Sequence, residues 1–110
     1  MTKSEEPIII YATFGDLENA RQVARRIIEE RLGACVNIIP GATSFYEWEG
    51  KIEEQSEMIM VIKSLKGHEL SVIGMIEALH SYDEPAIITL PVLGGAVSYL
   101  DWASKQVGKV

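Results

Sequence analysis

Apolar residues recur every three to four positions between Leu17 and Leu32, which is the spacing of one face of an α-helix. These positions are Leu17, Ala20, Val23, Ala24, Ile27, Ile28 and Leu32. Asp16 stands where an N-cap residue belongs, and Gly33 stands where a C′ glycine often ends a helix. The pattern predicts a helix that begins at Leu17 and ends just before Gly33.

Extended segments flank this helix on both sides. Pro7 opens IIIYATF, a β-branched and aromatic run that predicts a strand. After the helix, ACVNIIP predicts a short buried strand that ends at Pro40-Gly41, and SFYEWE then alternates. Glu49-Gly50-Lys51 predicts a hairpin turn. The next run, IEEQSEMIMVIKS, is polar near the turn and apolar from Met58 onwards, so we expect a long hairpin with a hydrated tip.

The last third of the chain continues this alternation of helices and strands. Residues 66–80 carry apolar positions at helical spacing and predict a second helix. AIITLPVL predicts the fourth strand. Because Pro91 cannot donate a ladder hydrogen bond, this part should lie at a sheet edge or a bulge. Ser98, with Asp101 three positions later, predicts the start of a short C-terminal helix.

The predicted order of elements defines a fold class. Strand, helix, strand, strand, helix, strand and a small extra helix is the split βαβ, or ferredoxin-like, arrangement (βαββαβ). It is an α+β fold with a mainly antiparallel sheet and both main helices on one face. The extended segment from Ala34 to Ser64 is long for four strands and would expose an aromatic-bearing edge. Since exposed apolar edges are usually covered by pairing, we infer a self-associating protein.

Size and charge limit the classes of function. The 110 residues fit one domain, 1–110, in which residues 1–6 are expected to form a loose end. Sixteen acidic and ten basic residues give a net charge of −6, which disfavours a nucleic-acid partner. No apolar run approaches the roughly 18 residues that span a bilayer, and MTKSEEPIII is not a signal peptide, so no membrane partner is expected. A single cysteine suits a cytoplasmic location.

Several stretches together resemble the CutA divalent-cation-tolerance family. They are ATFGDLENARQVARRIIEERLGACV, GACVNIIPGATSFYEWEGKIEEQSEMIMVIKS, HSYDEPAIITLPV and SYLDWA. The resemblance covers roughly residues 7–106. It implies a ferredoxin-like subunit assembled as a tight homotrimer through long strands, similar to the PII-type signalling proteins. The family is linked to copper tolerance and metal homeostasis, and the resemblance brings no catalytic mechanism with it.

The copper site proposed in some family members uses a cysteine near the end of the first strand and two adjacent histidines after the second helix. In this sequence the first position is held by Ala12, and the histidine pair corresponds to Leu79-His80. One of three ligands remains. The resemblance therefore leaves only a weak site, at His80, for copper or another divalent cation.

Three roles are open to Cys35: a metal ligand, a nucleophile, or a small side chain that fills space. No helix N-terminus or basic side chain lies near it in sequence to make it reactive. Neither CxxC nor H-x₃-H spacing appears. Free cysteines usually behave as small buried hydrophobes, so we predict a packing role. His68, between Gly67 and Glu69, is expected to be exposed.

His80 ends the second predicted helix, where the helix dipole favours a cation. Tyr82 and Glu84 follow within four residues and add oxygen donors. We predict that these side chains are binding candidates, with His80 and Glu84 as metal ligands. A surface histidine that caps the helix is the alternative.

Strand direction and the resemblance predict a ligand cleft between subunits, formed by Asn37, Trp48, Lys63 and Tyr82. Tyr46 and Trp48, at period two, also suit packing in a subunit interface. Carboxylates flank the hairpin tip, namely Glu47, Glu49, Glu53, Glu54 and Glu57. Copies from neighbouring subunits could form an oxygen-rich cation site, or the carboxylates serve as a solubilising rim.

The leading hypothesis is a non-enzymatic cytoplasmic homotrimer of the CutA type that binds a divalent metal or a small ligand and contributes to metal homeostasis. The first alternative is a PII-like sensor whose clefts bind a metabolite anion, with Lys63 supplying charge. The second is a structural scaffold trimer without a physiological metal. No nucleophile–base pair or metal tetrad can be assembled from the sequence, so no enzyme is expected.

Overall fold

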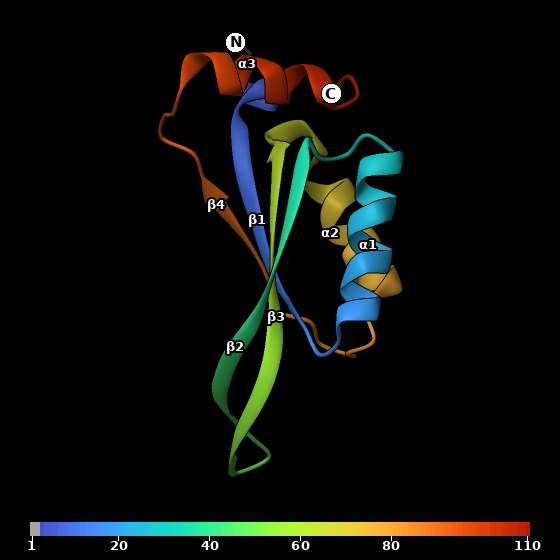
Figure 1. Ribbon diagram of the computed structural model, residues 1–110, viewed down its shortest axis with the longest axis vertical. Helices are drawn as coiled ribbons and strands as arrows, with labels where there is room; N and C mark the ends of the chain where they lie inside the picture. The colour runs from blue at the N-terminus through green and yellow to red at the C-terminus, as the bar shows by residue number, and fades with distance from the viewer. Residues whose placement is uncertain (1–2) are drawn as a thin grey trace.

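The computed structural model describes residues 3–110, in which two helices cover one face of a four-stranded antiparallel sheet (Figure 1). The order of elements confirms the predicted split βαβ arrangement and its α+β class. The strands are β1 (Pro7–Phe14), β2 (Cys35–Trp48), β3 (Lys51–Leu65) and β4 (Ile87–Pro91). The helices are α1 (Leu17–Glu29), α2 (Glu69–Leu79) and α3 (Val97–Gln106), with 3₁₀ turns η1 (Lys3–Glu5) and η2 (Lys66–His68). Within residues 3–110, no helix is both long and apolar enough to cross a membrane.

The strands lie in the order β2-β3-β1-β4, and each neighbouring pair is antiparallel. On β1, Ile10 lies opposite Ile62 of β3 on one side and Thr89 of β4 on the other. β4 is therefore an edge strand, which confirms the position predicted from Pro91. α3 lies across the end of the sheet that is opposite to the hairpin tip (Figure 1).

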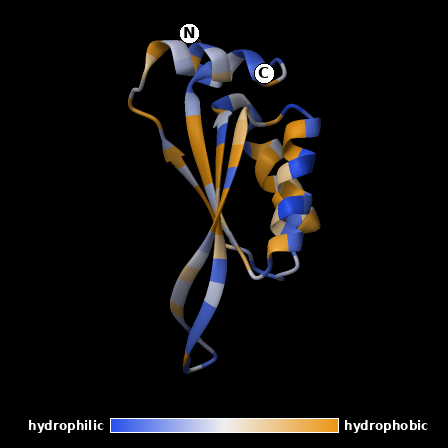
Figure 2. Cartoon of the chain, in the orientation of Figure 1, coloured by the Kyte–Doolittle hydropathy of each residue, from blue (hydrophilic) through white to orange (hydrophobic). Residues whose placement is uncertain are grey.

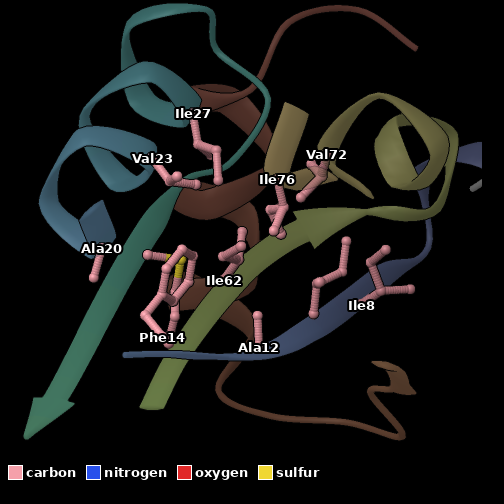
Figure 3. Packing of buried hydrophobic residues seen from close by; sticks show 11 residues of the cluster. Ile8, Ala12, Phe14, Ala20, Val23, Ile27, Ile62, Val72 and Ile76 are labelled. Atoms are coloured by element: carbon pink, nitrogen blue, oxygen red, sulfur yellow. The ribbon is translucent and has the colours of Figure 1, made fainter. Parts of the chain in front are cut away.

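The hydrophobic core lies between the helices and the face of the sheet that they cover. Alternate side chains of β1 point to this face, namely Ile8, Ile10, Ala12 and Phe14. Val23 and Ile27 of α1 and Val72 and Ile76 of α2 gather around Ile62 of β3 (Figure 3). All five are fully buried. Since burial of one such side chain contributes about 1.5–3 kcal/mol, this cluster holds both helices on the sheet.

Helix α1 begins as predicted and ends earlier than predicted. The Asp16 carboxylate accepts a hydrogen bond from the Asn19 backbone N–H at 2.7 Å, which caps the helix. At the other end, Arg31 adopts the left-handed conformation, with φ 57°, and the N–H of Leu32 bonds to the Ile27 carbonyl. The prediction that Gly33 is the C′ glycine is wrong. A Cβ on Gly33 would lie 3.0 Å from Ile27, so this glycine permits close packing instead.

Strand β2 of the β2–β3 hairpin is longer than the short strand predicted from the sequence. The prediction that a strand ends at Pro40-Gly41 is wrong, because β2 continues through this dipeptide with a register shift between Ile39 and Ala42. The turn is confirmed: Glu49 and Gly50 both have positive φ, 51° and 79°, as a two-residue type I′ hairpin requires. The lower part of the hairpin is hydrophilic along β3, and the middle of β1 is hydrophobic (Figure 2).

The chain termini are more ordered than predicted within the described residues. Residues 1–2 of the expected loose end lie outside the described part. Residues 3–6 are docked, because the Glu6 carbonyl accepts the Lys66 N–H at 2.8 Å and η1 packs on η2. His68, expected to be exposed, is half-buried, and its Nε2 donates to the Gly108 carbonyl at 2.7 Å.

The start of α3 also differs from its prediction. The helix begins one residue before Ser98, with Ala96 at the N-cap position and no side-chain cap. Ser98 therefore lies in the first turn. The predicted pairing of Ser98 with Asp101 as a capping box is wrong, because a capping side chain must come from the N-cap residue itself.

The sheet face away from α1 and α2 is largely apolar and open. Side chains at alternate positions point to it, including Ile39 of β2 and Ile88 and Leu90 of β4. These three expose 49%, 53% and 45% of their surface. We refer to this surface as the helix-free face. An apolar sheet face of this kind is usually covered by a second layer or by another chain.

Candidate functional site

A cavity of about 770 Å³ lies where the β2–β3 hairpin meets the loop between α2 and β4. Tyr11 and Thr13 of β1 form its base, and the loop contributes residues 81–84. Ser44 and Gln55, which are opposite each other in the hairpin, line its far part. The cavity is thus built from segments far apart in the sequence, on the helix-free face of the sheet.

Two kinds of side chain dominate the lining of this cavity. Its aromatic residues are Tyr11, Phe45, Tyr46, Trp48 and Tyr82. Its carboxylates are Glu53, Glu57, Asp83 and Glu84. Among the described residues, no lysine, arginine or histidine lines it. The cavity therefore combines ring surfaces with a concentration of negative charge.

A hydrogen bond between Tyr82 and Glu57 joins the loop to β3. The Tyr82 hydroxyl donates to Oε2 of Glu57 at 3.0 Å, and Glu57 is buried, with 6% of its surface exposed. The pKa of Tyr82 is raised to about 12, mainly by burial of its ring and then by the bond to Glu57 and the charge of that carboxylate. The phenol consequently stays protonated and available as a donor to Glu57.

His80 lies directly behind Tyr82. Its Nε2–H donates to the Thr13 carbonyl at 2.7 Å, and its Nδ1 accepts the Tyr82 N–H at 3.0 Å. This pair of bonds requires the neutral ring with the proton on Nε2. The ring also stacks on Phe14, with centroids 4.3 Å apart. His80 therefore acts as a structural link between α2 and β1.

Two residues outside the predicted set shape the loop. Asn19 of α1 donates from Nδ2 to the Leu79 carbonyl at 2.9 Å and accepts the Ser81 N–H at 3.0 Å. Gly15 leaves space for Tyr82, because a Cβ there would lie 2.6 Å from the phenolic oxygen. Both contacts are long-range, and no local feature of the sequence marks them.

The residues predicted from the sequence lie in four places. Trp48, Tyr82 and Glu84 line the cavity, together with the hairpin carboxylates Glu53 and Glu57. Asn37 is exposed on the helix-free face and does not line it. The other predicted side chains, His80 and Lys63, lie behind the loop and at the opposite end of β2, respectively.

Lys63 lines a second cavity, of about 270 Å³, beside α3. Its Nζ lies 4.0 Å from Sγ of Cys35, which is the opposite residue in the hairpin, and 5.5 Å from the centre of the Tyr99 ring. No basic side chain lies near Cys35 in sequence, but the fold brings Lys63 beside it. Cys35 is half-buried rather than fully packed away.

The carboxylates around the first cavity do not converge on one point. Residues 3–110 contain no group of three or more histidine, cysteine, aspartate or glutamate side chains that could hold a metal ion. Glutamates 47, 49 and 54 of the predicted rim are exposed and lie outside the cavity lining. In one chain, the arrangement offers scattered oxygen donors beside aromatic rings.

Comparison with known proteins places the chain among close relatives. The family model "CutA1 divalent ion tolerance protein" matches residues 8–106. "Divalent-cation tolerance protein CutA" of Pectobacterium atrosepticum is 42% identical over 102 residues, which is 93% of both chains. "Protein CutA, chloroplastic" of Arabidopsis thaliana is 40% identical over 92% of this chain, and the match spans 56% of the Arabidopsis protein.

Solved structures agree with this result. CutA1 from Oryza sativa superposes with a TM-score of 0.93 at 35% identity, covering 99% of this chain and 100% of the rice chain. The divalent cation tolerance protein from Thermus thermophilus gives a TM-score of 0.89 at 37% identity, covering 93% and 99%. The family model covers nearly the whole sheet, both main helices and α3. The chain belongs to the CutA1 divalent ion tolerance protein family.

Proposed function

We propose that the protein is a non-enzymatic homotrimer that binds divalent cations and contributes to metal-ion homeostasis in the cytoplasm. The observation that carries this proposal is the cavity of the β2–β3 hairpin, whose charged side chains are all carboxylates. Carboxylate oxygens are the ligands that hard divalent cations prefer. The names of the bacterial relatives, divalent-cation tolerance proteins, support the same class of ligand.

Oxygen ligands support the proposal better than the single histidine does. Glu84 and Glu53 line the cavity from the loop and from β3, with Asp83 beside them. Both ring nitrogens of His80 are already hydrogen-bonded, so a metal can bind there only after one bond breaks. Copper favours imidazole and thiolate ligands, and Cys35 lies at the opposite end of β2 from the hairpin turn. We therefore propose a weak oxygen-donor site, with His80 as the second candidate ligand.

The helix-free face supports the trimer. It exposes Ile39, Ile88 and Leu90 on a sheet that must otherwise leave this surface in water. Burial of apolar surface contributes about 25 cal/mol per Å², so association through this face is favourable. Because the cavity opens on the same face, neighbouring subunits can add ligands that one chain lacks. The number of subunits, three, is taken from the family resemblance.

Two features support a binding role over catalysis or anion sensing. The hydrogen-bond partners of His68 and His80 within the described residues are backbone groups, so neither histidine is paired with a serine or cysteine as a general base. A metabolite anion requires positive charge, and Lys63 is outside the carboxylate-lined cavity. The PII-like alternative is therefore not favoured.

Equilibrium dialysis with Mn²⁺, Zn²⁺ and Cu²⁺ at pH 7 tests the proposal, after Cys35 and the terminal amine are blocked. Glu53→Gln and Glu84→Gln should each weaken binding about tenfold, equivalent to about 1.4 kcal/mol. Glu47→Gln is the matched control, because Glu47 lies on the same hairpin outside the cavity. His80→Ala separates the imidazole site from the oxygen site. Absence of metal binding in all samples would favour the scaffold hypothesis.

Light scattering tests the trimer. A homotrimer has three times the 12.2 kDa mass of the chain. Ile88→Glu and Leu90→Glu place charges on the helix-free face and should dissociate it, whereas Leu70→Glu on the exposed surface of α2 should not. A monomer in the unmodified protein contradicts the proposed assembly.

A further inference from the structure

We propose that the C-terminal tail, residues 107–110, is a detachable strap that occupies a peptide-binding site between the end of α1 and the start of α2 (Figure 1). The site is formed by Arg31, which follows α1, and by Gly67 and His68 of η2. We refer to these three residues as the tail site. The contacts that define it lie within one chain and use neither the hairpin cavity nor the helix-free face. The tail is thus an intramolecular ligand, and a free peptide of the same sequence binds when the tail leaves.

Gly108 is held in the tail site through both of its backbone groups. Its N–H donates to the Arg31 carbonyl at 2.8 Å, and its carbonyl accepts a hydrogen bond from Nε2 of His68 at 2.7 Å. The Arg31 guanidinium also donates to the Lys105 carbonyl at 3.3 Å. Hydrogen bonds to the main chain are the usual source of affinity where a protein recognises an extended peptide. The tail is therefore bound in the manner of a peptide ligand.

Two valines anchor the tail on either side of these hydrogen bonds. Val107 is 6% exposed, and its backbone is extended directly after α3. Val110 packs on Gly67, where an added Cβ would lie 2.4 Å from Cβ of Val110. Lys109, between them, is exposed. The apolar side chains thus contribute to binding, and Gly67 provides the space that the last residue needs.

The tail can leave without opening the core. Val107 is buried outside the cluster that joins α1 and α2 to the sheet, and residues 107–110 belong to no helix or strand. Short terminal segments of this kind open locally, at a lower free energy than global unfolding.

The tail site is formed before the tail docks. Arg31 has a φ of 57°, and the bond from the Leu32 N–H to the Ile27 carbonyl fixes this turn at the end of α1. The carbonyl of Arg31 is therefore directed by the helix end and not by Gly108. Since His68 directly precedes α2, which packs on the core, its backbone is also held independently of the tail.

Hydrogen exchange in the unmodified protein is the first test. The amide of Gly108 should exchange at least about tenfold faster than the amides paired between β1 and β3, because it opens with the tail alone. NMR measures both sets of amides in one sample. Equal rates would mean that the tail opens only with the whole fold, which overturns the proposal.

Binding of a peptide in trans is the second test, with the full-length chain throughout. Val107→Asp should detach the tail, because a buried unpaired charge is costly. The probe is the dye-labelled peptide QVGKV, the sequence of residues 106–110, followed by fluorescence anisotropy. It should bind the Val107→Asp chain saturably and the unmodified chain at least about tenfold more weakly, because the tethered tail competes at high effective concentration. The peptide QDGKV is the control and should not bind.

Variants of the tail site, made in the Val107→Asp chain, locate the peptide. Gly67→Ala and His68→Ala should each weaken binding of QVGKV about tenfold, since one fills the space of the last valine and the other removes a donor. His68→Gln keeps an N–H donor and should retain more affinity than His68→Ala. Gly74→Ala is the matched control, because its methyl group meets no atom within 4 Å, and it should leave affinity unchanged.

Each other outcome decides against the proposal. Equal binding of QVGKV to the unmodified and Val107→Asp chains, or binding that Gly67→Ala does not weaken, places the peptide elsewhere and overturns the tail site. Absence of binding to a folded Val107→Asp chain shows that the tail is a fixed part of the fold. If Val107→Asp does not fold, Val110→Asp replaces it. If neither variant folds, hydrogen exchange of Gly108 in the unmodified protein decides.

Discussion

The Tyr82 hydroxyl donates a hydrogen bond to Oε2 of Glu57 at 3.0 Å, and so joins the α2–β4 loop to the middle of β3. These residues are 25 positions apart in the sequence. The bond satisfies a buried carboxylate and fixes one wall of the cavity. The stability of the fold and the shape of the site therefore depend on the same contact.

Removal of the Tyr82 hydroxyl should destabilise the protein. Tyr82→Phe leaves Glu57 buried without its donor, which is expected to lower the free energy of unfolding by about 1–3 kcal/mol. Tyr46→Phe is the control, because the Tyr46 hydroxyl makes no hydrogen bond within the described residues and lines the same cavity. Urea denaturation measures the free energy of unfolding of both variants. Equal effects of the two variants would contradict the structural role of this bond.

Alkaline pH should weaken the same contact. The pKa of Tyr82 is raised to about 12 in the folded protein, mainly by burial and then by Glu57, whereas an unfolded tyrosine titrates near pH 10. The folded state thus holds this proton more tightly. Its contribution to stability is complete below about pH 10 and is lost as pH rises from about 10 to about 12.

Absorbance titration of tyrosinate checks this pH dependence. Of the four tyrosines, one should titrate late, and Tyr82→Phe should remove that late step. The control is the same titration in denaturant, where the late step should be absent from both proteins. If Tyr82→Phe removes a tyrosinate titration step near pH 10 and the late step remains, Tyr82 is not the tyrosine with the raised pKa.

His80→Ala should cost more stability than His68→Ala. His80 makes two hydrogen bonds and stacks on Phe14, so its removal should lower the free energy of unfolding by roughly 2–4 kcal/mol. His68 makes one bond, to the Gly108 carbonyl, and its loss should cost about 1 kcal/mol. Thermal and urea denaturation in the absence of metal provide the comparison. If the two variants differ in stability only when metal is added, His80 acts as a metal ligand and not as a structural link.

Two glycine-to-alanine changes should have opposite effects. In Gly15→Ala the new methyl group meets the Tyr82 oxygen at 2.6 Å, displaces the hydroxyl from Glu57, and should cost about 1–3 kcal/mol. In Gly74→Ala the methyl group meets no atom within 4 Å on an exposed side of α2, so it should stabilise the helix by about 0.5–1 kcal/mol. Denaturation curves of the two variants test this, and a neutral Gly15→Ala would show that Tyr82 adjusts without cost.

The fold was predictable because most of its signals are local. The cap at Asp16, the turn at Glu49-Gly50, and the edge position of Pro91 each follow from the chemistry of one or two residues. The errors arose where two local signals competed. Gly33 suits a helix end, but tight packing against Ile27 needs a glycine there, and Arg31 takes the left-handed position.

The site was only partly predictable, because it depends on long-range contacts. Trp48, Tyr82 and Glu84 were expected to bind ligand, and they line one cavity. Lys63 and Trp48 were expected to meet in a cleft between subunits, and within one chain the pairing with Cys35 places Lys63 at the other end of β2 from Trp48. Glu57 looks in sequence like one more exposed carboxylate of the hairpin. Its burial is produced by the loop that carries Tyr82, and no pattern within β3 shows it.

The register shift at Pro40-Gly41 inverts the alternation of β2. Between Ile39 and Ala42 this strand has one residue more than β3 has between Ile59 and Glu57, and an odd insertion exchanges the two faces of a strand. Before the shift, odd-numbered residues such as Ile39 point to the helix-free face. After it, even-numbered residues such as Trp48 point to that same face. A uniform ladder would turn the indole to the opposite side of the hairpin. A single inserted residue thus decides that the apolar face and the aromatic walls form one continuous surface.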